Sequence, residues 1–296
     1  MQHWVKDKHL RKGVFDTYHS IKFGNLSNNT WKDTYDDWHL APSSRPVINP
    51  PAQKVKTLDI PGGDGLIDLS TSLTGYPVYQ NRTGSIEFIV LNDFRPWQIA
   101  YSDIMGYLHG KTMQAILEDD PGYYYEGRFS VNSWKSEKNW SKITIDYSVG
   151  PYKWSLQDST DDWLWDPFSF IDGVIRPSFF NGIVVSTTVK ELSFVPDEED
   201  TVHTAVEATD YAPVKPEFIV SENLQGQLVV PDVTLMITKS DSTTERKTLL
   251  GGETTSIAGL LLWNGKWMYD GKPVTVSVDT MSGTAKLAVR FRPGRL

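Results

Sequence analysis

The sequence predicts a mainly β protein made of two strand-rich modules with one clear helix. Three observations carry this prediction. Aromatic residues make up 12% of the chain, with 11 Trp, 13 Tyr and 12 Phe, and such residues favour pleated sheets as well as binding surfaces. Several short segments alternate apolar and polar residues, which is the period of a half-buried strand. With 296 residues, the chain is long enough for two domains of ordinary size.

The first half begins with an extended stretch. Residues 30–51 are rich in Trp, Asp, Ser and Pro and end in Asn49-Pro50-Pro51. Because proline favours a non-helical path, we expect a long arm or loop across a neighbouring surface, with a mobile loop as the equal alternative. Residues 85–91 follow, and their β-branched and aromatic side chains predict a strand.

A change of period predicts a helix over about residues 96–109. Apolar side chains recur on one helical face at Trp97, Tyr101, Ile104, Met105 and Leu108. Pro96 suits the first turn of this helix, and Gly110 suits the left-handed residue that follows its last turn.

A hairpin and a further strand come next. Residues 113–117 and 123–131 flank Asp120-Pro121-Gly122, and Pro followed by Gly at the centre of a turn predicts a type II turn. Residues 142–149 then alternate, with Ile143, Ile145, Tyr147 and Val149 on one face. This pattern predicts a half-buried antiparallel strand.

Residues 151–172 interrupt the pattern of strands. We therefore predict an N-terminal domain over 1–155, a linker over 156–172 and a C-terminal domain over 173–296. Strand-like segments return at 183–189, 233–238, 274–278 and 286–292. Short strands separated by polar turns predict a β-sandwich for this second half.

Charge and composition exclude several classes of function. The net charge is −8, whereas a protein that reads nucleic-acid sequence carries a basic surface. The chain has no cysteine, which excludes disulfides and Cys-ligated metals. The first residues lack the apolar core of a signal peptide, and no apolar run approaches the ~20 residues of a membrane span. We expect no membrane insertion and no sequence-specific nucleic-acid binding.

No motif for catalysis, a cofactor or a metal stands out in the sequence. Residues 106–112 place three residues between two glycines where a phosphate loop has four, and they close a helix where such a loop opens one. The six histidines lack zinc-site spacing, and no Gly-x-Ser-x-Gly elbow occurs. We predict that the protein is not an enzyme and has no catalytic residue, cofactor or metal.

One acidic cluster leaves alternatives open. It combines Asp158, Asp161, Asp162 and Asp166 with Trp163 and Trp165. A calcium site or a sugar-stacking platform would use such residues, but the tight alternate spacing and the glycine of a calcium loop are missing. We therefore favour a solvated linker with aromatic anchors. Glycoside hydrolysis by paired carboxylates is a separate alternative, because sequence spacing does not fix the distance between two carboxylates.

Several short motifs occur in the order and spacing of one known family. They are Gly24-Asn25-Leu26-Ser27, Ser44-Arg45-Pro46, Pro61-Gly62-Gly63-Asp64-Gly65, Leu69-Ser70, Leu108-His109-Gly110, Asp119-Asp120-Pro121-Gly122-Tyr123-Tyr124, Trp134-Lys135-Ser136, Tyr152-Lys153 and the ending at 290–296. Together they resemble the distal tail protein (Dit) family of bacteriophages with long, non-contractile tails that infect Gram-positive hosts. The resemblance covers about residues 14–180 and beyond that rests on the ending.

The resemblance implies a structural virion protein at the phage tail tip, assembled in the bacterial host cytoplasm. It implies that a β-sandwich-type N-terminal belt domain, with an extended N-terminal arm, forms a hexameric ring through which DNA passes. A C-terminal galectin-like sandwich would dock receptor-binding or baseplate proteins for host attachment. The tail tube protein and a tail-tip or tail-associated lysin protein would be the other partners. A basic stretch before Val14 and a polar stretch at 239–255 depart from the family.

A carbohydrate-binding module that contacts host cell-wall polysaccharide is the alternative function. Such a module stacks sugars on exposed aromatic rings, and Trp263 and Trp267 are the candidate residues. Burial of the same side chains in the sandwich core is the interpretation that we favour.

Overall fold

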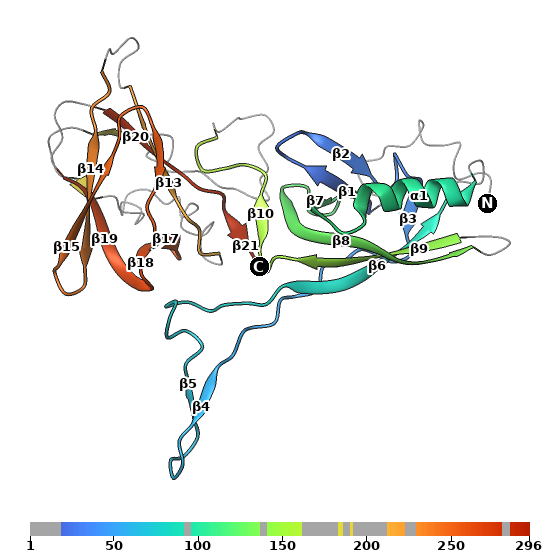
Figure 1. The fold of residues 1–296 in the computed structure, drawn as a ribbon, viewed down its shortest axis with the longest axis horizontal. Helices are drawn as coiled ribbons and strands as arrows, with labels where there is room; N and C mark the ends of the chain where they lie inside the picture. Colours follow the sequence, from blue (N-terminus) through green and yellow to red (C-terminus); the bar gives the residue numbers. More distant parts are fainter. Residues whose placement is uncertain are drawn as a thin grey trace. The chain divides into compact units, whose positions relative to one another are not determined.

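The computed structural model describes residues 19–91, 96–136, 141–161, 183–185, 190–191, 212–222, 229–279 and 285–296. These residues are mainly β with one helix, which confirms the predicted fold class (Figure 1). The chain divides into two compact units, Met1–Ala52 with Gln80–Lys153 and Gln53–Tyr79 with Trp154–Leu296. The predicted division into domains 1–155 and 173–296 with a linker at 156–172 stays a prediction. Compact units in the folded chain do not show which part folds on its own.

The first unit is built on one antiparallel sheet. Its strands follow the order β2 (Thr30–Asp33), β1 (Ile21–Asn25), β7 (Lys111–Leu117), β8 (Tyr123–Ser136), β9 (Ser141–Val149), β6 (Arg82–Val90) and β3 (Leu40–Pro42). The predicted alternation is confirmed, since Ile143, Ile145, Tyr147 and Val149 of β9 are all buried. They share one core with Phe23, Phe88 and Phe129, because alternate residues of a strand point to the same face.

Helix α1 (Trp97–Leu108) packs on this core, close to the predicted range. Ile104 and Leu108 are buried, as the helical period predicts. Two expectations are wrong in detail. Pro96 stands just before the helix as its cap residue, and Met105 is 37% exposed because it lies at the border of the buried face. No helix in the described part of the chain is long and apolar enough to cross a membrane.

The hairpin after the helix is confirmed, but its turn differs from the prediction. Strands β7 and β8 pair antiparallel, with Lys111 opposite Phe129. The turn is closed by a hydrogen bond from Tyr123 N to Asp120 O at 3.2 Å. Gly122 is not among the described glycines with positive φ, so the type II conformation is wrong. Gly110 does adopt the predicted left-handed conformation, with φ of 73°.

The arm predicted over residues 30–51 is wrong for its first part. Strand β2 pairs with β1, and β3 pairs with β6, so both belong to the sheet. Between them, Trp38 packs on Phe23 and Tyr107 with ring centroids 6.0 and 5.5 Å apart. Burial of these aromatic rings outweighs the turn-forming composition of the segment.

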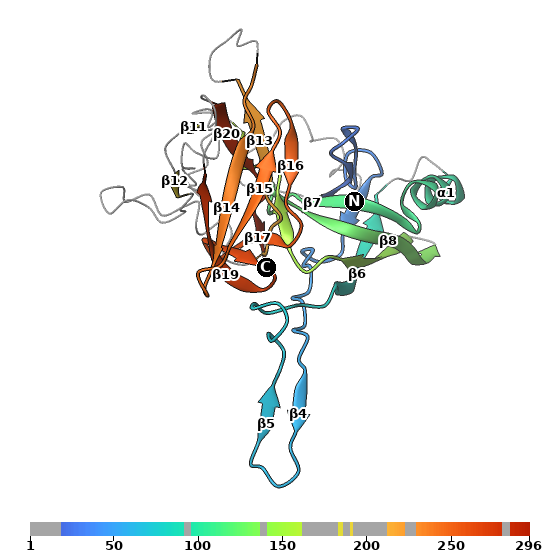
Figure 2. The same ribbon diagram turned by 60° about the vertical axis from the view of Figure 1, so that its left-hand side comes forward.

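The second unit contains two packed sheets. One has the order β11 (Ile183–Val185), β20 (Ala285–Arg290), β13 (Glu217–Ser221) and β16 (Thr254–Ser256). The other has the order β15 (Thr244–Leu249), β14 (Val233–Lys239), β19 (Lys272–Val278), β18 (Lys266–Tyr269) and β17 (Leu260–Trp263), with β12 (Lys190–Glu191) beside β19 (Figure 2). Phe218 of β13 stacks on Trp267 of β18 at 5.9 Å, so the inner faces meet as in a sandwich. Residues 186–189 of the strand predicted at 183–189 lie outside the described residues.

The ending of the chain fastens the first residues of the predicted linker. Strand β10 (Lys153–Ser155) pairs with β21 (Gly294–Arg295). The guanidinium of Arg292 donates to the carbonyl oxygens of Ser155 and Leu156 at 2.6 and 2.5 Å. The buried Ser159 hydroxyl donates to Val289 O at 2.9 Å. The described start of this segment is therefore bound along the C-terminal strand.

Candidate functional site

Residues 53–79 form a long hairpin, which we call the arm (Figures 1 and 2). Its strands β4 (Thr57–Asp59) and β5 (Leu66–Asp68) pair antiparallel. At the tip, Gly63 N donates to Ile60 O at 3.0 Å, and Gly62 has φ of 82°. Pro61 and Gly62 thus occupy the centre of a type II turn. The Pro-Gly signature therefore forms this turn here and not at Pro121-Gly122.

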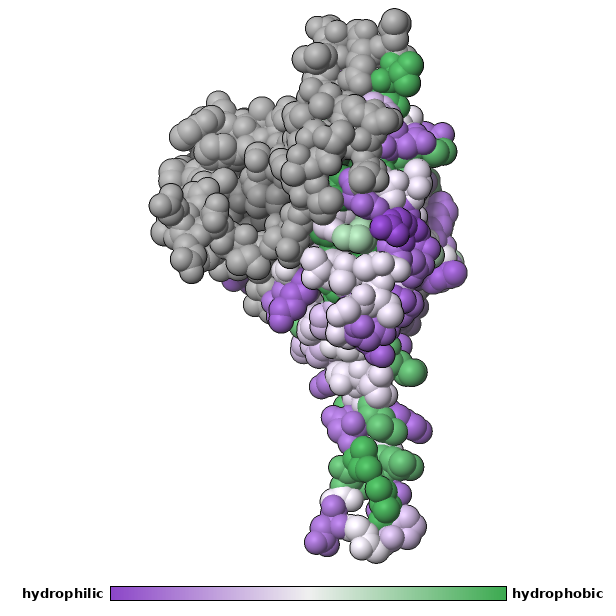
Figure 3. All heavy atoms as spheres, turned by 90° about the vertical axis from the view of Figure 1, so that its left-hand side faces the viewer, coloured by the Kyte–Doolittle hydropathy of each residue, from purple (hydrophilic) through white to green (hydrophobic). Residues whose placement is uncertain are grey.

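The arm exposes apolar side chains along most of its length. Every residue from Gln53 to Leu69 is exposed. The large apolar side chains among the exposed residues of the arm are Val55, Leu58, Ile60, Leu66, Ile67, Leu69 and Leu73, with Leu66 at 63% and Leu73 at 91%. Figure 3 shows apolar side chains gathered on the lower part of this hairpin. A contiguous apolar surface of this kind marks a site of association.

The arm carries charges of both signs. Lys54 and Lys56 lie at its start, and Asp59, Asp64 and Asp68 follow toward and past its tip. Hydrogen bonds from the Ser70 side chain and backbone hold the pKa of Asp68 below its ordinary value, and Ser70 N lies 2.8 Å from its Oδ1. The arm thus combines exposed apolar side chains with charged residues.

Two glycines seat the base of the arm on the sandwich of the same unit. Gly75 and Gly271 have φ of 75° and 76°, a region that disfavours side chains. A Cβ on Gly75 would lie 2.3 Å from Gly271 O, and a Cβ on Gly271 would lie 2.6 Å from Leu73 O. The two backbones approach so closely that neither position has room for a side chain.

The two tryptophans of the sugar-binding alternative have different surroundings. Trp267 is 4% exposed and stacks on Phe218, so its ring has no open face. Trp263 is half-buried and packs on Tyr76 of the arm, with ring centroids 5.6 Å apart. The sugar site stays a prediction, in which the stacking face would come from Trp263. Trp163 and Trp165 lie outside the described residues.

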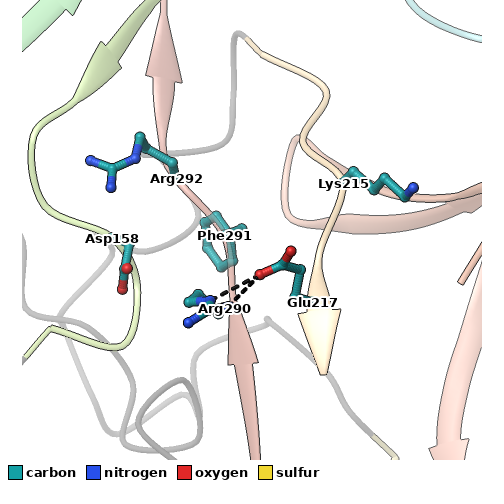
Figure 4. Close-up of a pocket in the computed structure, with 6 residues that line it drawn as sticks. All are labelled: Asp158, Lys215, Glu217, Arg290, Phe291 and Arg292. Carbon is teal, nitrogen blue, oxygen red and sulfur yellow. Dashed lines mark hydrogen bonds and ion pairs between the residues drawn. The ribbon is translucent and has the colours of Figure 1, made fainter. Parts of the chain in front are cut away.

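A cavity of about 390 Å³ lies beside the C-terminal strand (Figure 4). It is lined by Asp158, Lys215, Glu217, Arg290, Phe291 and Arg292. Arg290 donates through Nε and Nη2 to one carboxylate oxygen of Glu217 at 2.9 and 2.7 Å. Figure 4 shows Lys215 and Arg292 pointing to opposite sides, so these cations do not converge on one ligand. Arg290 and Arg292 fasten the C-terminal strand, through Glu217 and through the carbonyl oxygens of Ser155 and Leu156.

The acidic cluster uses its described carboxylates in a local turn. Asp158 Oδ1 accepts hydrogen bonds from Thr160 N and Oγ1 at 2.8 and 2.7 Å, and Asp161 Oδ2 accepts one from Asp158 N at 2.7 Å. Among the residues that the structure describes, no group of three metal-ligating side chains occurs. Asp162 and Asp166 lie outside the described residues. The calcium alternative therefore gains no support from Asp158 and Asp161.

Asp119 joins three segments of the first unit. Its carboxylate accepts hydrogen bonds from His19 Nδ1 and Arg45 Nε, both at 2.8 Å. Burial by itself would raise the pKa of Asp119, but the hydrogen bonds from Arg45 and His19 together outweigh it, and the pKa lies below its ordinary value. The Asp119-Asp120 part of the motif therefore fixes the chain where β1 begins.

We expect Asp119→Asn to lower the free energy of unfolding by about 1 kcal/mol at neutral pH. Because the folded-state pKa is below the unfolded one, the stabilisation is present above the ordinary pKa of about 4 and is lost as the pH falls through the folded pKa. Denaturant titrations at neutral and acidic pH should show a flatter acid limb for the variant than for the native protein. Asp64→Asn, at the exposed tip of the arm, is the control. An unchanged acid limb in Asp119→Asn would contradict this role.

Comparison with known proteins finds similar chains among solved structures. No family model matches the chain, and no curated protein matches its sequence. Among solved structures, the chain is similar to the crystal structure of the Dit protein (gp 19.1) of phage SPP1, described as a paradigm of the hub adsorption apparatus in phages that infect Gram-positive bacteria. The two chains are 12% identical, the match covers 93% of this chain and 99% of that chain, and the TM-score is 0.48.

Proposed function

We propose that this protein is a distal tail protein, a structural and non-enzymatic component of a bacteriophage tail tip. Six copies form a ring that joins the tail tube protein to receptor-binding or baseplate proteins and to a tail-tip or tail-associated lysin protein. DNA passes through this ring, and the galectin-like sandwich contributes to host attachment. The virion tail tip is its final location, after assembly in the bacterial host cytoplasm. The order of the sequence motifs supports the family, and the arm supports self-association.

The exposed arm is the observation that carries this proposal. A two-stranded hairpin without a covering layer is marginally stable in water, and every residue from Gln53 to Leu69 is exposed. A stable protein interface uses about 20–30 residues from each side, a size that the arm alone approaches. The arm therefore has the length and the apolar character of a segment that is covered after assembly.

The charge of the chain agrees with passage of DNA. A ring that guides DNA without holding it should not bind phosphates, and a net charge of −8 opposes such binding.

Replacement of Leu66 by glutamate should break the self-association. Leu66 is 63% exposed, so the variant should fold, while a buried carboxylate in the assembled interface should weaken association about 30-fold or more. Size-exclusion chromatography with light scattering measures the mass, and electron microscopy of the native protein should show six-fold rings. Leu250→Glu, at a 48% exposed leucine outside the arm, is the matched control.

Two results would overturn the proposal. One is a native chain that stays monomeric at micromolar and higher concentrations and forms no ring with tail tubes. The other is a Leu66→Glu variant that assembles as well as the Leu250→Glu control.

A further inference from the structure

Arg82 is a buried charge at the point where the chain returns from the arm to the first unit. It begins β6, and its side chain is 5% exposed. Among the residues that the structure describes, no other charged residue is buried. Its guanidinium forms no ion pair with a described carboxylate, and its Nη2 has no hydrogen-bond partner there. Because burial of an uncompensated charge is unfavourable, this guanidinium indicates a role beyond stability.

The guanidinium ties two backbone segments of the first unit to β6. Its Nε donates to Pro151 O, just after β9, at 2.8 Å. Its Nη1 makes a longer hydrogen bond of 3.4 Å to Asn49 O, in the segment that leads into the arm. The Cζ atom lies 5.5 Å from the ring centroid of buried Tyr125, a contact that offsets part of the lost hydration of the charge. Carbonyl groups and an aromatic ring thus stand where an ion pair would have a carboxylate.

Asn49 is the residue through which the leaving strand is held. Its N–H donates to Tyr147 Oη at 2.9 Å, and its Nδ2 donates to Thr83 O at 2.8 Å. Gly84 makes room for this arrangement, because a Cβ there would clash with Tyr147 Oη and would lie 2.7 Å from Asn49 Nδ2. Glycine weakens the interior of a strand, so its presence in β6 agrees with a close approach that the fold requires. We call Asn49, Arg82, Gly84 and Tyr147 the root cluster.

The root cluster lies directly before and after the arm in the chain. Two prolines follow Asn49 and restrict the backbone on the way to the arm. Gln80 N then donates to Ala52 O at 2.7 Å, which pairs the returning strand with the leaving one. Residues 53–69 of the arm are all exposed. The hydrogen bonds of the root cluster therefore hold the ends of an otherwise exposed segment in the first unit.

We propose that Arg82 is a positioning residue for the arm, whose guanidinium fixes the segment where the chain leaves the first unit. Where assembly is measured, this proposal rests on the proposed function. A segment that binds a neighbour is best held in one orientation beforehand, since ordering it during association costs free energy. The planar fork of arginine can donate to Pro151 O and Asn49 O at once, whereas a lysine ammonium is a single point of charge. The position therefore requires arginine and not only a cation.

Hydrogen exchange of the folded chain tests this role. Arg82→Lys should speed exchange of the Asn49 and Gln80 amides about 10-fold or more, because the root cluster then opens without the rest of the unit. Ile143→Val is the control, since Ile143 is fully buried in β9 and lies opposite Phe88, six residues along β6 from Arg82. Loss of one methyl group should lower the denaturation midpoint without changing these local openings. Equal exchange of these amides in the Arg82→Lys and Ile143→Val chains would overturn the proposal.

A second variant tests whether the root cluster acts as one unit. Tyr147→Phe removes the hydroxyl that accepts the Asn49 N–H and keeps the buried ring. It should also speed Asn49 exchange, and it keeps the root cluster testable if Arg82→Lys does not fold. Because both substitutions act on Asn49, exchange in the double variant should be slower than the product of the two single factors. If the two factors simply multiply, the residues do not act together, and the proposal is overturned.

Assembly gives the measurement that depends on the proposed function. Arg82→Lys should weaken association about 10-fold in light scattering across a concentration series, whereas Ile143→Val should assemble as the native chain does. An Arg82→Lys chain that exchanges faster but assembles normally would overturn the positioning role. A native chain that stays monomeric would instead overturn the proposed function, and the exchange rates would still decide whether Arg82 holds the root cluster.

Discussion

Gly271→Ala should lower the free energy of unfolding by about 3 kcal/mol. Part of this cost is conformational, because Gly271 has φ of 76°, where a Cβ meets its own backbone. The rest is steric, since the new Cβ would lie 2.6 Å from Leu73 O and 3.3 Å from Thr74 C. These are backbone atoms of the arm, so the clash is relieved only if the arm leaves its seat. Denaturant titration measures the loss.

Gly252→Ala separates the two parts of this cost. Gly252 has φ of 80° in the same unit, and nothing lies within 4 Å of its Cβ position. That variant should therefore lose only the conformational part, about 1 kcal/mol. Equal losses for Gly252→Ala and Gly271→Ala would show that the close approach of Gly271 to Leu73 does not hold the arm. Gly271→Ala should also weaken association, because a displaced arm is not oriented for its neighbour.

Phe129→Ala should destabilise the first unit by about 4 kcal/mol. Phe129 is 1% exposed and meets Phe23 edge to face, with ring centroids 5.0 Å apart. Its carbonyl accepts the Gly110 N–H at 3.0 Å, so the same residue holds the end of α1. Loss of the ring leaves a cavity between β1 and β8 that the sheet cannot close, because backbone pairing fixes the strands on both sides.

Phe129→Leu is the control for this substitution. It keeps most of the volume and should cost about 1 kcal/mol. Chemical denaturation followed by tryptophan fluorescence suits the comparison, since Trp38 stacks on Phe23 at 6.0 Å and reports on this core. If Ala and Leu cost the same, the ring of Phe129 does not fill the core as the structure indicates.

Local patterns were sufficient to predict the elements whose buried residues recur with the period of a strand or a helix. The alternation of β9 required no knowledge of its neighbours, because Ile143 and Ile145 face the core on any antiparallel sheet. Helix α1 was predictable for the same reason, from the period of Trp97, Ile104 and Leu108 and from Gly110 after its end. Each of these signals depends on residues within one turn or one strand.

The arm shows why a local signal can be assigned to the wrong place. Pro61-Gly62 and Pro121-Gly122 carry the same turn signature, yet only the first forms a type II turn. Leu58 and Ile60 before that turn, with Leu66 and Ile67 after it, are a hairpin pattern that sequence could have identified. Apolar side chains on a hairpin are usually predicted to lie in the core, and no sequence pattern shows that those of the arm remain exposed.

The sequence alone determined that the chain is strand-rich, acidic and free of cysteine. It also determined the positions of the helix and of the hairpin that follows it, because both depend on short-range patterns. Contacts between distant residues settled the rest. The first part of the segment 30–51 joins the sheet, where Trp38 packs on Phe23 and Tyr107. The base of the arm is held where Gly75 and Gly271, far apart in the sequence, approach each other closely. The conformation of these segments depends on contacts between residues that are distant in sequence. The free energy of such packing cannot be inferred from a short stretch of sequence.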